Sequence, residues 1–108
     1  MSPSADLASI PDQLTNNFLT NLASGTFWCG GFIEYPKKIV NWVNGDQWTG
    51  FTAWAPGEPN GWNGITTGYI EVHTQTSGKW RPGFWNDGLG VELKNVMCQY
   101  DPDQGKKL

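Results

Sequence analysis

The sequence predicts an α+β domain with one helix, several short antiparallel strands and a long loop region. Glycine accounts for 14 of the 108 residues, beside 7 prolines and 7 tryptophans. Average glycine usage is about 7 %, so this composition favours loops and short strands. A helical period of apolar residues occurs once, near the N-terminus. Residues 44–69 then hold eight glycines and prolines, and so long a loop in a compact domain is typically functional.

Length and charge limit the classes of function. A chain of 108 residues is near the commonest domain size, so we expect one domain over residues 1–100 and a disordered polar tail at 101–108. The net charge of -3 argues against nucleic-acid binding, which needs a basic surface. No apolar run is long enough to span a membrane. Residues 1–10 lack the basic and apolar regions of a signal peptide.

The helix is expected from Pro11 to Ala23, after a frayed end at residues 1–5. Ser9 is expected to cap it, with Asp12 at the third position of a capping box. Ser24 and Gly25 are expected to end it. The predicted apolar face consists of Leu14, Phe18, Leu19 and Leu22.

The strands are expected where short apolar or alternating runs lie between turn residues. These runs are Thr26–Phe32, Ile39–Val43, Ile70–Thr74 and Asn95–Tyr100. The segment 81–90, RPGFWNDGLG, is expected to be a second loop. The two loops would each hold acidic and amide side chains beside a tryptophan.

Two oxygen-bearing side chains flank a proline in the first loop. In the stretch AWAPGEPNGW, residues 53–62, Glu58 and Asn60 stand on either side of Pro59. Proline, glycine and asparagine are common in surface turns, which is the plain interpretation. Carboxylate and amide oxygens are also the ligands that a hard cation prefers, so the sharper interpretation is a cation site.

The second loop carries a similar pair, because Asn86 and Asp87 follow Trp85. If the two loops converge, their four side chains form a partial oxygen shell. Such a shell leaves positions for water or for the hydroxyl groups of a sugar.

Taken in order, these motifs resemble the C-type lectin domain over about Ala5 to Tyr100. The matching segments are LASI with NNFL (residues 7–10 and 16–19), FWCGG (27–31), WAPGEPN (54–60), WND (85–87) and VMCQY (96–100). The resemblance implies the C-type lectin-like fold and an extracellular, calcium-dependent module that binds glycans.

The order Glu-Pro-Asn in that family implies selectivity for mannose, glucose or fucose, and a cis peptide bond between Glu58 and Pro59. Trp62 is expected beside the sugar as an apolar wall, with a packing role as the alternative. The resemblance assigns both the calcium ion and the sugar to Glu58, Asn60, Asn86 and Asp87.

Several departures from the family pattern weaken this expectation. The opening strand, most of the first helix and the first paired cysteine have no counterpart before Ala5, so the domain is expected to be incomplete on that side. An uncovered sheet edge would favour self-association. Tyr69 and Gly90 stand where the loop disulfide belongs, and residues 64–68 contain no carboxylate. Calcium affinity depends on charge count and rigidity, so we expect a weak or lost site.

Two other readings stay open. The first is a C-type lectin-like fold that binds protein or another surface without calcium. The second is an enzyme built on His73, the only histidine, but the strand pattern predicts this residue on a solvated face, so we expect no enzymatic activity. Cys29 and Cys98 allow either a disulfide or two thiols, and we expect two buried thiols.

Overall fold

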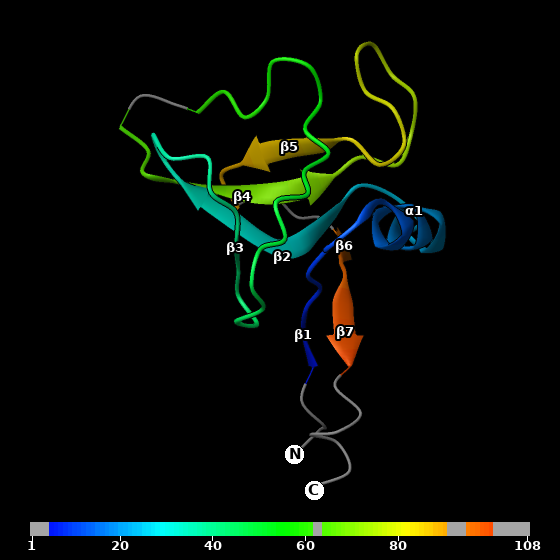
Figure 1. The fold of residues 1–108 in the computed structure, drawn as a ribbon. Coiled ribbons are helices and arrows are strands. Elements are labelled where there is room, and N and C mark those ends of the chain that lie inside the picture. Colours follow the sequence, from blue (N-terminus) through cyan, green and yellow to red (C-terminus); the bar gives the residue numbers. More distant parts are fainter. Residues whose placement is uncertain (1–4, 62–63, 91–94, 101–108) are drawn as a thin grey trace, which may run out of the picture.

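A five-stranded sheet forms the centre of the domain in the computed structural model, which describes residues 5–61, 64–90 and 95–100. The strand order is β3-β2-β4-β5, and β6 pairs parallel with β2 while the other neighbours are antiparallel. β1 and β7 form a separate two-stranded antiparallel ribbon (Figure 1). The bounds are β1 Ala5–Leu7, β2 Phe27–Glu34, β3 Asn41–Trp42, β4 Thr67–Val72, β5 Trp85–Gly88, β6 Asn95–Val96 and β7 Cys98–Tyr100. The predicted α+β architecture is confirmed.

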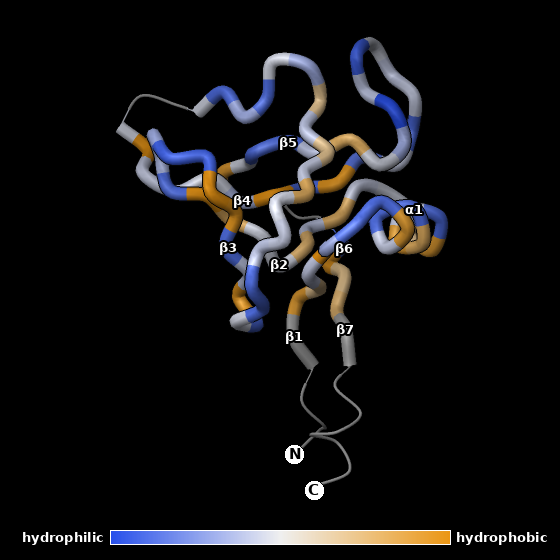
Figure 2. The backbone as a smooth tube through the Cα atoms, in the orientation of Figure 1, coloured by the Kyte–Doolittle hydropathy of each residue, from blue (hydrophilic) through white to orange (hydrophobic). Residues whose placement is uncertain are grey.

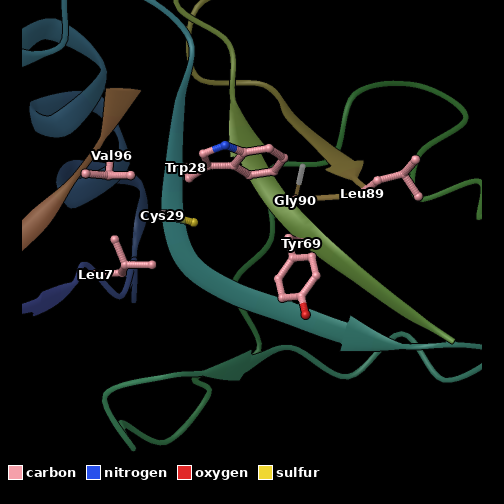
Figure 3. A pocket seen from close by; sticks show the side chains of 7 residues that line it. All are labelled: Leu7, Trp28, Cys29, Tyr69, Leu89, Gly90 and Val96. Carbon is pink, nitrogen blue, oxygen red and sulfur yellow. The ribbon is translucent and has the colours of Figure 1, made fainter. Parts of the chain in front are cut away.

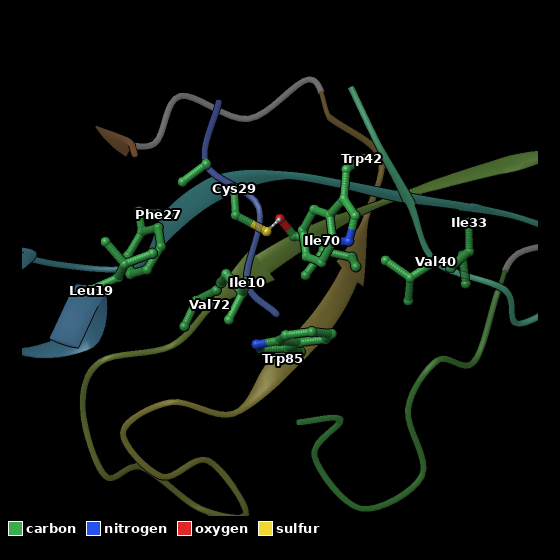
Figure 4. Packing of buried hydrophobic residues seen from close by; sticks show 11 residues of the cluster. Ile10, Leu19, Phe27, Cys29, Ile33, Val40, Trp42, Ile70, Val72 and Trp85 are labelled. Atoms are coloured by element: carbon green, nitrogen blue, oxygen red, sulfur yellow. Dashed lines mark hydrogen bonds between the residues drawn. The ribbon is translucent and has the colours of Figure 1, made fainter. Parts of the chain in front are cut away.

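The core joins the sheet to the long loop between β3 and β4. Trp85 on β5 is fully buried, and its ring meets Trp42, Phe51 and Trp54 edge to face at centroid distances of 6.3, 5.6 and 5.6 Å. Side chains from β2 and β4 complete this cluster (Figure 4). Hydrophobic colour marks part of β4, whereas the loops above it are largely hydrophilic (Figure 2). Aromatic packing therefore fixes the loop on the sheet.

The helix α1 spans Gln13–Leu22, within the predicted range, but its cap differs from the prediction. Asp12 is the N-cap, and its side chain accepts a hydrogen bond from Thr15 N at 2.8 Å. The Ser9 hydroxyl instead donates to Asp46 Oδ2 at 2.5 Å. A tertiary contact thus takes Ser9 away from the helix, and Asp12 supplies the capping oxygen.

The helix faces the sheet with polar side chains, which corrects the predicted apolar face. Of the four predicted residues only Leu19 is buried, beside Asn16 and Thr20. Asn16 Oδ1 accepts from Trp85 Nε1 at 2.8 Å, and Asn16 Nδ2 donates to Gly83 O at 3.0 Å. These bonds explain why a polar face points inward. The other three residues are exposed: Leu14 by 81 %, and Phe18 and Leu22 by 64 % each.

The N-terminal segment is extended rather than frayed from Ala5 onward. β1 pairs with β7 in the register Ala5↔Tyr100 to Leu7↔Cys98, and Ala8 N donates to Met97 O at 2.7 Å. Of the matched segments at residues 7–10 and 16–19, only the second therefore lies in α1. Residues 1–4 and the tail 101–108 lie outside the described residues. No helix in the described parts is long and apolar enough to cross a membrane.

The two cysteines are free and differ in exposure. The Cys29 thiol is buried and donates to Ile70 O at 3.6 Å, drawn as a dashed line in Figure 4. Burial raises the pKa of Cys29 to about 12. Cys98 is exposed, contrary to the expectation of two buried thiols, because it lies on the two-stranded ribbon outside the main sheet.

Candidate functional site

The loop with the Glu-Pro-Asn order holds a buried carboxylate. The bond between Glu58 and Pro59 is cis, as predicted. The Glu58 side chain is 4 % exposed, and its Oε2 accepts from Lys79 Nζ at 2.6 Å. Glu58 Oε1 is buried and has no hydrogen-bond partner among the described residues. A buried acceptor without a partner costs about 1–3 kcal/mol, so this oxygen is suited to receive a ligand.

The second pair of predicted ligands lies on a strand rather than in a loop. Asn86 and Asp87 belong to β5, which pairs with β4 in the register Glu71↔Asn86 and Ile70↔Asp87. This pairing with a distant segment has no local sequence signal, so the loop expectation for residues 81–90 was wrong over β5. Successive strand residues point to opposite faces of a sheet. The two side chains therefore leave β5 in different directions.

Asp87 connects the sheet to the Glu-Pro-Asn loop. Its side chain is fully buried, with Oδ1 accepting from Asn60 N at 3.2 Å and Oδ2 accepting from Gly61 N at 2.9 Å. The Tyr35 hydroxyl also donates to Asp87 Oδ2. Burial, then the hydrogen bond and charge of Asp87, then the charge of Glu58, raise the pKa of Tyr35. Both carboxylates therefore raise the pKa of one half-buried tyrosine.

Asn86 faces a different partner on the other side of the sheet. Its Nδ2 donates to Glu71 Oε1 at 2.7 Å, and Glu71 is 5 % exposed. Glu71 Oε2 lies 3.9 Å from His73 Nε2. The His73 ring stacks on Trp80 at 4.0 Å between centroids and 9° between planes. His73 is therefore half-buried beside a carboxylate, which corrects the predicted solvated face.

The structure thus brings three of the predicted residues together. Glu58 and Asn60 share the loop, and Asp87 holds the backbone of that loop from below. Asn86 is turned away toward Glu71, and Trp62 lies outside the described residues. Among residues 5–61, 64–90 and 95–100, no group of three or more His, Cys, Asp and Glu side chains has the geometry to hold a metal.

Three residues of this region were missed by the sequence analysis. Glu71 alternates with buried Ile70 and Val72, which predicts an exposed side chain. Lys79 reaches Glu58 across 21 positions of the chain, and Tyr35 reaches Asp87 across 52. No local pattern signals either contact, because both depend on how the loops pack against the sheet.

A shallow apolar groove of about 400 Å³ lies elsewhere on the domain (Figure 3). Its lining comes from β1, the main sheet and the segment after β5, with little polarity beyond the Cys29 thiol and the Tyr69 hydroxyl. The main lining residues are Leu7, Trp28, Cys29, Tyr69, Leu89 and Val96. None of the described residues that line it is charged, so these residues offer no anionic ligand to a cation.

Comparison with known proteins gives relatives in sequence and in fold. Lectin BRA-3 from Megabalanus rosa is 33 % identical over 99 residues, which are 90 % of this chain and 56 % of that protein. The human C-type lectin domain family 10 member A is 35 % identical over 98 residues, or 80 % of this chain and 30 % of that protein. The chain matches no known family profile.

Among solved structures, the C-type lectin CEL-I from Cucumaria echinata superposes with a TM-score of 0.70 at 24 % identity. This match covers 90 % of the present chain and 70 % of that chain. The chain spans about half the length of the first curated relatives that it matches, at 56 % of each. The likeness to CEL-I therefore concerns the fold, and the likeness to BRA-3 extends to the sequence.

Proposed function

We propose that this chain, which has the C-type lectin-like fold and is similar in sequence to C-type lectins, binds carbohydrate through the surface around Glu58 and Asn60. The observation that carries the proposal is Glu58 Oε1, a buried carboxylate oxygen without a hydrogen-bond partner among the described residues. A sugar hydroxyl or a cation would satisfy this oxygen. The relatives are lectins, and the chain is accordingly assigned to a non-enzymatic family.

Calcium is the cation that the family implies, and the oxygen ligands around Glu58 fit it in part. Glu58 offers a buried anionic oxygen, and Asn60 adjoins it with a carboxamide in an exposed position; both are donors that a hard cation prefers. Asp87 already accepts three hydrogen bonds, and Asn86 is engaged with Glu71. We therefore propose a weak calcium site, in which Glu58 and Asn60 are the principal ligands.

The family pattern would add Asn86 and Asp87 to these ligands, and Asn86 could join only by leaving Glu71 and turning to the face of the sheet that carries Asp87. Bound calcium would accept hydroxyl oxygens of a sugar as further ligands. The order Glu58–Pro59–Asn60 supports a sugar of mannose type, and Trp62 is proposed as an apolar wall beside it. An extracellular location is proposed on the same family basis.

The second candidate is an interaction with protein, or another surface, that needs no metal. One observation favours it: the ammonium group of Lys79 already neutralises Glu58 at 2.6 Å. A site whose carboxylate has its own counter-charge gains less from a bound cation.

Retention on a mannose resin separates these candidates. We expect retention in calcium and elution by EDTA, with no retention on a galactose resin. Glu58→Gln should abolish retention, whereas Asp12→Asn removes the same charge from the exposed helix cap and should change nothing. Retention that survives EDTA would contradict the calcium site but not sugar binding. Absence of retention on a panel of immobilised glycans would favour the metal-free interaction.

A further inference from the structure

We propose that Lys79 is an internal cation that competes with calcium for Glu58, so that the metal binds only when Lys79 leaves. This inference rests on the proposed function, because it concerns the same carboxylate. Lys79 Nζ donates to Glu58 Oε2 at 2.6 Å and to Pro56 O at 2.8 Å. One ammonium group therefore contacts both the carboxylate of Glu58 and the backbone just before Glu58 in the same loop.

The hairpin that carries Lys79 is built to hold it there. Ser77 and Trp80 exchange two backbone hydrogen bonds of 3.1 and 2.9 Å across the turn. Arg81 Nη1 donates to the carbonyl oxygens of Gly78 and Trp80 at 2.7 and 2.8 Å. These bonds fix the backbone on both sides of Lys79, so its side chain starts from an ordered position.

An aromatic contact also helps to hold the ammonium group of Lys79 in place. Lys79 Nζ lies 4.9 Å from the centroid of the Trp80 ring, within the range of a cation–π interaction. Trp80 is itself stacked on His73 at 4.0 Å. The carbonyl of His73 accepts from Gly83 N at 2.7 Å, and Gly83 O accepts from Asn16 on α1. Lys79 is thus connected to the folded body of the domain.

The exposure of the two partners differs in a way that permits exchange. The Glu58 side chain is 4 % exposed, whereas that of Lys79 is 41 % exposed. Glu58 therefore stays in place and needs a cation near it, while Lys79 can swing into water. A calcium ion at Glu58 would stand next to the ammonium group, and the two positive charges repel each other. The two cations are alternatives at one carboxylate.

The missing carboxylate at residues 64–68 makes this competition matter. The proposed ligands carry two negative charges, from Glu58 and Asp87, and Lys79 cancels one of them. Calcium affinity follows ligand charge, so Lys79 would lower it further. In the metal-free protein the same residue is the counter-charge of Glu58.

Calorimetric titration with calcium alone tests the inference without a sugar. Lys79→Met should bind calcium at least about tenfold more tightly than the unaltered protein, since the repelling charge is gone. Lys79→Arg keeps the charge and should bind as weakly as the unaltered protein. Lys38→Met, which removes an exposed charge on the turn after β2, serves as the matched control and should have no effect. Circular dichroism verifies that each variant is folded.

A second readout follows Lys79 itself. Acetylation of the native protein, mapped by mass spectrometry, should modify Lys79 faster in calcium than in EDTA, with Lys37 and Lys38 unchanged. Equal calcium affinity in the unaltered protein and Lys79→Met, or absence of binding in both, would overturn the inference. A gain of calcium affinity without retention on any of the immobilised glycans would uphold it and refute the proposed function. Mannose retention with no gain would do the reverse.

Discussion

Asp87 on β5 is surrounded by neutral donors, whereas Glu58 in the loop above it faces an ammonium group. Two of the three donors to Asp87 are backbone N–H groups of residues 60 and 61, and the third is the Tyr35 hydroxyl. Glu58 has one partner, Lys79, and one oxygen without any among the described residues. Both side chains are nearly or fully withdrawn from water.

The difference separates a carboxylate with fixed partners from a carboxylate whose partner can be exchanged. Backbone donors cannot move away from Asp87 without unfolding the loop, so this residue defines the loop conformation. A lysine side chain can move away from Glu58 at the cost of one partly exposed ion pair. Three measurements of stability test this contrast, in order of decreasing effect, and thiol labelling then tests a similar contrast between the two cysteines.

Asp87→Asn should destabilise the domain far more than Glu58→Gln. An asparagine cannot accept all three hydrogen bonds of Asp87, so at least one donor loses its partner. We expect the free energy of unfolding to fall by about 2–4 kcal/mol. Glu58→Gln removes one ion pair with an exposed partner and should cost within about 1 kcal/mol. Urea unfolding followed by tryptophan fluorescence measures both. Equal losses in the two variants would contradict the distinction.

Tyr35→Phe should have an intermediate effect. It removes one of the three donors to Asp87 and leaves the two backbone donors, so we expect a loss of about 1–2 kcal/mol in urea unfolding. Tyr69→Phe is the control, because Tyr69 is 42 % exposed and should change stability within about 0.5 kcal/mol. A loss no larger than that of the control would mean that the hydroxyl is dispensable to Asp87.

The coupling between Lys79 and Glu58 should be small and sensitive to salt. A double-mutant cycle with Lys79→Met and Glu58→Gln should give about 0.2–1 kcal/mol at low ionic strength, because Lys79 is partly exposed. In 1 M salt the coupling should fall toward zero. Coupling that persists in high salt would show that the ammonium group is as firmly fixed as the donors to Asp87.

The two cysteines also differ in how firmly the fold holds them, and labelling of their thiols tests this difference with almost no effect on stability. Cys98 is exposed, so a maleimide should modify it in the native protein at pH 8. Cys29 should react only after unfolding, since burial raises its pKa to about 12 and the reactive thiolate is scarce. Mass spectrometry of peptides locates the label. Native labelling of Cys29 would indicate that β2 opens readily.

The sequence predicted those features that depend on local chemistry. The helix lies within the predicted range, although its cap and its buried face differ from those predicted. The cis bond before Pro59 was predicted from the resemblance, and so was the fold.

What could not be predicted depends on contacts between distant segments. β5 exists because it pairs with β4, and this pairing turns Asn86 and Asp87 to opposite faces. Ser9 left the helix cap for Asp46, 37 positions away. Lys79 stands in a turn with no motif, and only the packing of its hairpin on the loop brings it to Glu58.

The pairing of β1 with β7 decides how the domain can be presented to a ligand. Ala5 and Tyr100 are partners in this ribbon, which lies at the bottom of Figure 1, opposite the loop that carries Glu58. A tag or surface linkage attached beyond either end of the ribbon would therefore leave that loop pointing away from the support. Many copies anchored in this way would all turn that loop outward, and weak single contacts made by the loop would add up across the layer.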